Sequence, residues 1–224
     1  MYLQAIPALL KHPSILACPL LAAVMSILIN AAIAPFLTNA VGGAGAGLFS
    51  ILVQLIYLWA FGIAIIQASQ IWRSRRGSFD EAWEEGRRKF GGIALAAIGF
   101  QFVVWAATYI GSFFGGTLTY VLAAVAAFFL IYTIPAAAIG GMPGSLAISA
   151  SIRAVRANWI GSIVLAIVFV ALWYVVPAFL PYALSALSQT LYSLVVALYE
   201  AIVLAYLAFP FAKQYDDVAF RGLW

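Results

Sequence analysis

One acidic residue lies deep inside an apolar stretch of this sequence. Glu200 falls within the segment 195–208, and the nearest basic residue, Lys213, is 13 residues away. At 1.5 Å of helical rise per residue this is about 20 Å, too far for a glutamate side chain to reach an aqueous interface. An ionisable group at such a depth usually faces the inside of a helical bundle, where it pairs, carries protons or binds substrate. Glu200 is therefore the first candidate for chemistry.

Polar side chains at comparable depth in other apolar segments are candidate partners for Glu200. They are Gln101, Asn30, Tyr57 and Tyr132. Amide and phenol groups can donate hydrogen bonds to a carboxylate, so the set predicts a central site for a ligand or a proton. The alternative is a neutral glutamic acid whose interhelical hydrogen bonds, worth about 0.6 kcal/mol each, only fix helix packing.

Residue types needed by enzymes and metal sites are otherwise scarce. His12 is the only histidine and Cys18 the only cysteine. The sequence thus lacks a histidine ligand set, a histidine base for an embedded protease and an internal disulfide. Glu84 and Glu85 are adjacent, as in intramembrane prenyl-protein proteases, but the partner histidines are missing. We expect no metal, no cofactor and no catalytic residue, and this inventory argues against an enzyme.

The composition indicates which solvent the chain faces. Of the 224 residues, 66% are hydrophobic and 8% are charged, whereas soluble domains have about 25% charged residues. The mean hydropathy is +1.08, and the apolar residues form long blocks, so the surrounding solvent is expected to be hydrocarbon. Six transmembrane helices in one all-α polytopic bundle are expected, at 13–37, 48–72, 90–113, 117–139, 159–180 and 184–210.

All 11 Lys and Arg residues fall on the same side of these six spans, and the loops 39–47, 114–116 and 181–183 carry no charge. The positive-inside rule therefore places both termini in the cytoplasm. Basic residues beside apolar spans are expected to contact anionic lipid headgroups and not nucleic acid. The predicted contacts are Arg73, Arg75, Arg76, Arg87, Arg88, Lys89, Arg153 and Arg156.

An apolar pattern with the spacing i, i+4, i+7 and i+11 precedes three of the spans. It comprises Tyr2, Ile6, Leu9 and Pro13, then Phe79, Trp83, Gly86 and Phe90, then Ile148, Ile152, Val155 and Trp159. This is one face of an amphipathic helix. We expect a single membrane domain, 1–224, of three repeats, each an interfacial helix followed by a transmembrane hairpin. The units span about 1–72, 78–141 and 145–210, with a cytoplasmic tail at 211–224; amphipathic linkers without true repetition are the alternative.

The second unit has the most explicit helix start. Ser78 and Glu81 have the spacing of a capping box, which predicts that a helix begins there. Acidic residues precede basic ones along this helix, as the helix dipole favours. Two pairs have the spacing of ion pairs, Glu84 with Arg88 and Glu85 with Lys89.

Two of the cytoplasmic segments resemble those of a known family. Residues 78–90 read SFDEAWEEGRRKF and residues 151–159 read SIRAVRANW. In these segments and in its layout the chain resembles the six-helix bacterial and archaeal membrane-protein family that includes the membrane domain of some glycerophosphodiester phosphodiesterases and many stand-alone relatives. In that family the phosphodiesterase activity belongs to a separate soluble domain. The resemblance therefore implies a membrane module without catalysis.

Two functions are compatible with these features. The first is a non-enzymatic membrane module that assembles with other membrane proteins, or with copies of itself, as an accessory or scaffolding subunit. The second is a small transporter or lipid-binding protein with a central polar site around Glu200. Because no transit peptide is recognisable, the expected location is a prokaryotic plasma membrane.

Overall fold

The computed structural model describes residues 1–32, 36 and 43–220, and this part of the chain contains helices and no strand. The expected all-α class is confirmed. In chain order the elements are α1 (Tyr2–Lys11), the 3₁₀ helix η1 (Pro13–Leu16), α2 (Ala17–Ala32), α4 (Gly43–Ser74), α5 (Phe79–Arg88), α6 (Phe90–Ser112), α7 (Gly116–Phe129), α8 (Thr133–Ala138), α9 (Ser145–Ala157), α10 (Trp159–Val170), the π-helical turn η2 (Ala171–Val175), α11 (Val176–Ala183) and α12 (Gln189–Phe220).

Several helices are long and apolar enough to cross a membrane. Five stretches meet this condition: Ile51–Ser74, Phe90–Ser112, Gly116–Ala138, Trp159–Ala183 and Thr190–Ala219. A sixth is present if Tyr2–Lys11 and Pro13–Ile29, which meet at an angle of 98°, count as one span. These stretches fall on the expected spans, although 33–35 and 37 at the end of the first span lie outside the described residues.

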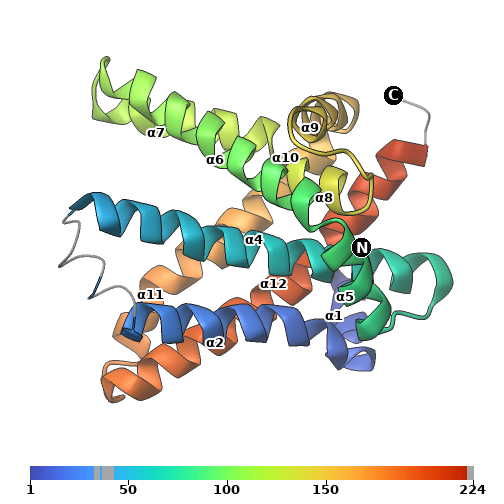
Figure 1. The fold of residues 1–224 in the computed structure, drawn as a ribbon, viewed down its shortest axis with the longest axis horizontal. Coiled ribbons are helices and arrows are strands. Elements are labelled where there is room, and N and C mark those ends of the chain that lie inside the picture. Colours follow the sequence, from blue (N-terminus) through green and yellow to red (C-terminus); the bar gives the residue numbers. More distant parts are fainter. Residues whose placement is uncertain (33–35, 37–42, 221–224) are drawn as a thin grey trace.

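The helices run largely alongside one another (Figure 1). The N-terminus, α5 and the C-terminal end of α12 lie at one end of the bundle, on the right in the view, and the turn between α6 and α7 lies at the other. The most buried residues are near the first of these ends, in the second halves of α4 and α12 and in α8. Ile63, Ile65, Ala138 and Leu207, for example, are fully buried.

α5 packs its apolar face against α4. The ring of Phe79 stacks on Trp83 with 6.0 Å between centroids, and Trp83 meets Trp59 of α4 edge-on at 5.2 Å. A Cβ atom at Gly86 would lie 2.4 Å from Cγ1 of Ile63, so the two helices approach too closely for any larger residue. The apolar face expected for this segment is therefore its packing face.

The polar side of α5 differs from the sequence prediction. Ser78 occupies the N-cap position, but its side chain makes no capping hydrogen bond, so the expected capping box is wrong. Glu84 pairs at 2.6 Å with Arg87 and not with residue 88, since residues three apart are also neighbours on a helix. The Glu85–Lys89 pair is present, at 2.6 Å.

Proline interrupts the span Trp159–Ala183. In η2 the Val176 N–H donates to the carbonyl of Ala171, five residues earlier. The next donor in this register would belong to Pro177, which has no N–H, so the carbonyl of Leu172 needs another partner. The hydroxyl of Tyr199, on α12, donates to that carbonyl at 2.5 Å. This hydrogen bond connects α12 to the span at the point where proline interrupts it.

Candidate functional site

The carboxyl group of Glu200 accepts a hydrogen bond from one tyrosine inside the bundle. Tyr57 of α4 donates from its hydroxyl to Oε2 of Glu200 at 2.5 Å. The side chain of Ser26, on α2, in turn hydrogen-bonds to the Tyr57 hydroxyl. The three residues come from three helices, α2, α4 and α12, that pack against one another. We refer to Ser26, Tyr57 and Glu200 as the Glu200 cluster.

The meeting of Tyr57 with Glu200 follows from the parallel register of α4 and α12. Sixteen residues further along each helix (57 to 73 and 200 to 216), Arg73 donates from Nε and Nη2 to the two carboxylate oxygens of Asp216, at 3.1 and 2.6 Å. Both pairs are 143 residues apart in sequence. The two helices thus keep one register over about 24 Å. Ser69 adds a hydrogen bond to Asp216 at 3.0 Å.

Among the described residues, only Tyr57 donates a hydrogen bond to the carboxyl group of Glu200. Its second oxygen, Oε1, accepts no hydrogen bond from another described residue. Both Glu200 and Tyr57 are partly exposed, and the ring of Trp173 lies edge-on to Tyr57 with 6.2 Å between centroids. A carboxyl oxygen in this setting can hold a proton or accept a hydrogen bond from a small polar ligand.

Tyr132 does not join the Glu200 cluster. Its hydroxyl donates to Oε1 of Gln214 at 2.5 Å and accepts from Ser162 at 3.1 Å. Gln214 also donates to the hydroxyl of Tyr2 at 3.1 Å. Since Gln214 follows Glu200 by 14 residues, this second polar group lies about 21 Å further along α12. It joins α1, α10 and α12 near the end of the bundle that carries the basic residues.

Gln101 and Asn30 were also expected near Glu200. The side chain of Asn30 lies outside the described part of the chain. Gln101 is on α6, partly exposed, and its amide makes no hydrogen bond with any residue that the structure describes. Of the three expected partners whose side chains the structure describes, it brings only Tyr57 to Glu200.

Gln101 lies beside a row of exposed aromatic side chains on α6. Phe102, Trp105, Tyr109 and Phe113 are 64%, 61%, 55% and 68% exposed. Their successive ring centroids are 6.3, 5.7 and 5.0 Å apart. The row lies opposite the buried residues of this helix, which are Ile93, Ala96, Ala97 and Gly111. We refer to Gln101 and the four aromatic residues as the α6 face.

The residues expected to contact anionic headgroups fall into two groups. Ion pairs with Asp216, Glu84 and Glu85 are formed by Arg73, Arg87 and Lys89, respectively. The other five, which like Arg73 and Arg87 are exposed, are Arg75, Arg76, Arg88, Arg153 and Arg156. All of these basic residues belong to α5, to α9 or to the end of α4 and the segments that directly follow α4 and α5. Contact with headgroups stays a prediction for them.

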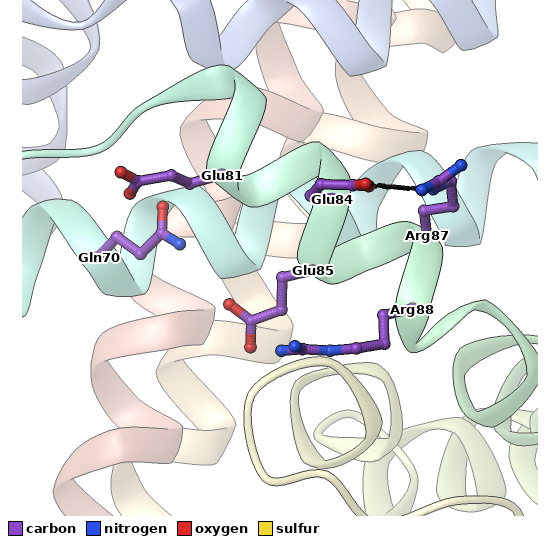
Figure 2. Close-up of a pocket in the computed structure, with 6 residues that line it drawn as sticks. All are labelled: Gln70, Glu81, Glu84, Glu85, Arg87 and Arg88. Carbon is purple, nitrogen blue, oxygen red and sulfur yellow. Dashed lines mark hydrogen bonds and ion pairs between the residues drawn. The ribbon is translucent and has the colours of Figure 1, made fainter.

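A cleft of about 700 Å³ lies between α4 and α5, and Figure 2 shows the residues that line it. Its lining residues are Gln70, Glu81, Glu84, Glu85, Arg87 and Arg88. The Arg88 side chain extends below Glu85, while Glu84 is bonded to Arg87. Because three carboxylates face two guanidinium groups, the cleft offers no strong preference for an ion of either sign.

Sequence reasoning missed Ser26 and the Arg73–Asp216 pair. A signal was available, because Arg73 follows Tyr57 by the same 16 residues as Asp216 follows Glu200. The second and sixth predicted spans cross the membrane in the same direction, and Arg73 and Asp216 follow their apolar segments. Aligning the two spans so that these opposite charges pair places Tyr57 beside Glu200. Ser26 carried no comparable signal, since serine is common in apolar helices.

Among the described residues, no group of three or more His, Cys, Asp or Glu side chains could hold a metal ion. Comparison with family models, curated proteins and solved structures finds no match to this chain. The resemblance to the six-helix family therefore stays a hypothesis.

Proposed function

We propose that this chain is a non-enzymatic integral membrane module that assembles with another membrane protein through the α6 face. The Gln101 amide carries the proposal. It is 11 residues from each end of the span Phe90–Ser112, which places it about 17 Å from either side of the bilayer. It has no hydrogen-bond partner among the described residues, and neither has the indole N–H of Trp105, one helical turn away.

Lipid tails can cover the aromatic rings of the α6 face but cannot satisfy an amide. An unpaired polar group in an apolar environment costs about 1–3 kcal/mol. A hydrogen-bonding side chain on a neighbouring transmembrane helix recovers about 0.6 to 1.7 kcal/mol, and the rings add rigid contact area. The partner that fits is therefore a transmembrane helix with a polar residue near mid-membrane.

The distribution of burial supports the same conclusion. In their most apolar stretches, 50% and 56% of the residues are buried in α4 and α12, but only 17% in α6 and 6% in the span Trp159–Ala183. α4 and α12 thus hold the module together, while α6 lies at its periphery with one side available to a partner.

The proposal includes the threefold organisation and the orientation predicted above. α1, α5 and α9 end at Lys11, Arg88 and Ala157, and in each instance the next helix begins two residues later. These ends are offset by 77 residues (88 − 11) and then by 69 (157 − 88), as the sequence pattern predicts. Six spans, cytoplasmic termini, a prokaryotic plasma membrane and a relationship to the six-helix family complete the proposal.

A photo-crosslinking amino acid at Trp105 tests the docking face in native membranes. We expect one dominant protein adduct from this position, and loss of that adduct when Gln101→Leu is added. Ile167 of α10 is the matched control, because it is 63% exposed and also faces outward from an apolar span. Lipid adducts alone from both positions would contradict the proposal. An adduct to a second copy of the chain would define the partner as the chain itself.

The Glu200 cluster favours a second candidate function, a small transporter or lipid-binding protein. The supporting observation is the hydrogen bond from Tyr57 to a carboxyl group whose second oxygen has no donor among the described residues. A hydrophobic carbodiimide reacts with a protonated carboxyl group inside the membrane, so it is expected to label Glu200 in the intact protein and not in Glu200→Gln.

Labelling alone would also occur with a purely structural acid. The second test is therefore proton flux across proteoliposomes containing Glu200→Gln or Tyr57→Phe. Loss of flux in Glu200→Gln, with the fold retained, would favour transport. Equal proton flux in wild type and both variants would contradict transport and would leave the Glu200 cluster with a packing role only.

A further inference from the structure

A second cleft, of about 570 Å³, lies between α1 and the C-terminal end of α4. It is separate from the Glu200 cluster, the α6 face and the cleft beside α5. Its lining residues are Gln4, Pro7, Ala8, Lys11, His12, Ile71, Trp72 and Arg75. Gln4, Ala8 and Lys11 are spaced at i, i+4 and i+7, so one face of α1 forms a wall of the cleft.

The charged residues that line this cleft are all basic. The lining includes Lys11 and Arg75 and no acidic residue. Neither of these two cations forms an ion pair with a residue that the structure describes. α1 and α4 both end here, and each helix C-terminus contributes about half a negative charge. Two full positive charges exceed that amount, and His12, Gln4 and the two cations all offer N–H donors.

Arg75 reaches the cleft through an unusual backbone conformation. Its φ angle is +59°, and it is the one described residue other than glycine with positive φ. Its N–H caps α4 by donating to the carbonyl of Ile71 at 3.0 Å. Glycine is the residue that normally takes this position, because it has no Cβ. Arg75 occupies this position although glycine would adopt the same φ angle with less strain.

The cleft also borders the apolar surface of α1. Leu3, Ile6 and Leu10 are 83%, 49% and 76% exposed, and they form a second face of the same helix. Opposite them, Ala5 is fully buried. Trp72 closes the inner side of the cleft, where its Nε1 donates to the carbonyl of Phe209 at 3.1 Å. A phosphate group between Lys11 and Arg75 would therefore lie next to a surface suited to acyl chains.

We infer that this cleft binds the phosphate of an anionic phospholipid headgroup, held by Lys11 and Arg75 with donors from His12 and Gln4. The exposed apolar face of α1 favours a lipid over free phosphate as the source of that group. The inference is independent of the docking role of the α6 face, because the two surfaces share no residue.

Native mass spectrometry of the whole protein, released from nanodiscs of mixed phosphatidylglycerol and phosphatidylcholine, tests this inference. Wild type is expected to retain one phosphatidylglycerol. In the variant Lys11→Gln/Arg75→Gln the retained amount of phosphatidylglycerol is expected to fall by about thirtyfold. Each basic residue near anionic lipid contributes about 1 kcal/mol, or about fivefold, and two such residues are removed. The control is Lys213→Gln, which removes one positive charge from a side chain that is paired with Asp217 and lines neither cleft. It should change retention by less than about twofold, whereas Lys11→Gln alone should lower it about fivefold.

Arg75→Gly separates binding from folding. Glycine relieves the positive φ angle, so this variant is expected to unfold at a higher temperature than wild type and yet to retain less phosphatidylglycerol. Equal loss of lipid in the control variant, or full retention in Arg75→Gly, would overturn the inference. Displacement of the lipid by an equal concentration of inorganic phosphate would overturn the lipid as its source.

Discussion

Alanine substitutions at the two ends of the Arg73–Asp216 pair should differ in their effect on stability. The side chain of Asp216 is 8% exposed and that of Arg73 is 52% exposed. In Arg73→Ala the carboxylate stays buried, with Ser69 as its remaining hydrogen-bond donor among the described side chains. In Asp216→Ala the guanidinium group can turn towards water.

The size of the difference follows from the burial of each partner. Removing one partner of a buried ion pair costs about 3–5 kcal/mol, and because water reaches the Arg73 side we expect about 3 kcal/mol for Arg73→Ala. Loss of the hydrogen bonds in Asp216→Ala, with the cation free to be solvated, should cost about 1 kcal/mol. The double variant should resemble Asp216→Ala, since neither charge is then left buried.

Reversible unfolding in mixed micelles measures these free energies. Glu84→Ala is the control, because it breaks an ion pair whose partners are 60% and 70% exposed and should cost at most about 0.5 kcal/mol. If Asp216→Ala destabilised the protein as much as Arg73→Ala, the carboxylate would not be buried as described. The Arg73–Asp216 pair would then not hold the common register of α4 and α12.

Two further substitutions test the packing of individual helices by the same measurement. Gly86→Ala should destabilise the protein by about 1–2 kcal/mol, since the new Cβ would meet Ile63, whereas Gly91→Ala, with nothing within 4 Å, should be neutral or stabilising. A neutral Gly86→Ala would contradict the close approach of α5 to α4. Tyr199→Phe should cost about 1–2 kcal/mol, because the carbonyl of Leu172 loses its donor beside the proline; an unchanged free energy of unfolding would show that water or another group replaces the hydroxyl.

The positions of the apolar spans could be predicted from the sequence because they depend on length and hydropathy alone. A span needs about 20 apolar residues, and no packing detail alters that requirement. The apolar face of α5 was predictable for a similar reason, since Phe79, Trp83 and Gly86 repeat with the helical period. The absence of a capping bond at Ser78 was not predictable, because such a bond depends on a side-chain rotamer that surrounding contacts decide.

The partners of Glu200 could be predicted only in part. Depth along a span follows from residue number, but the direction in which a side chain points depends on how each helix is rotated against its neighbours. Tyr132 shows the difficulty, because the break between α7 and α8 carries it into the polar group around Gln214. Gln101 has a suitable depth but is on a peripheral helix. Tyr57 was found because α4 and α12 are neighbours in a shared register.

Isolation of the protein in polymer discs that retain native lipid, followed by quantitative mass spectrometry, is the experiment to perform first. We expect one membrane protein, or a second copy of this chain, at a fixed stoichiometry in wild type. We expect its loss in Gln101→Leu/Trp105→Leu and its retention in the control Ile167→Ala. A solitary wild-type monomer, or a partner retained by the Gln101→Leu/Trp105→Leu variant, would contradict assembly through the α6 face and would turn attention to Glu200.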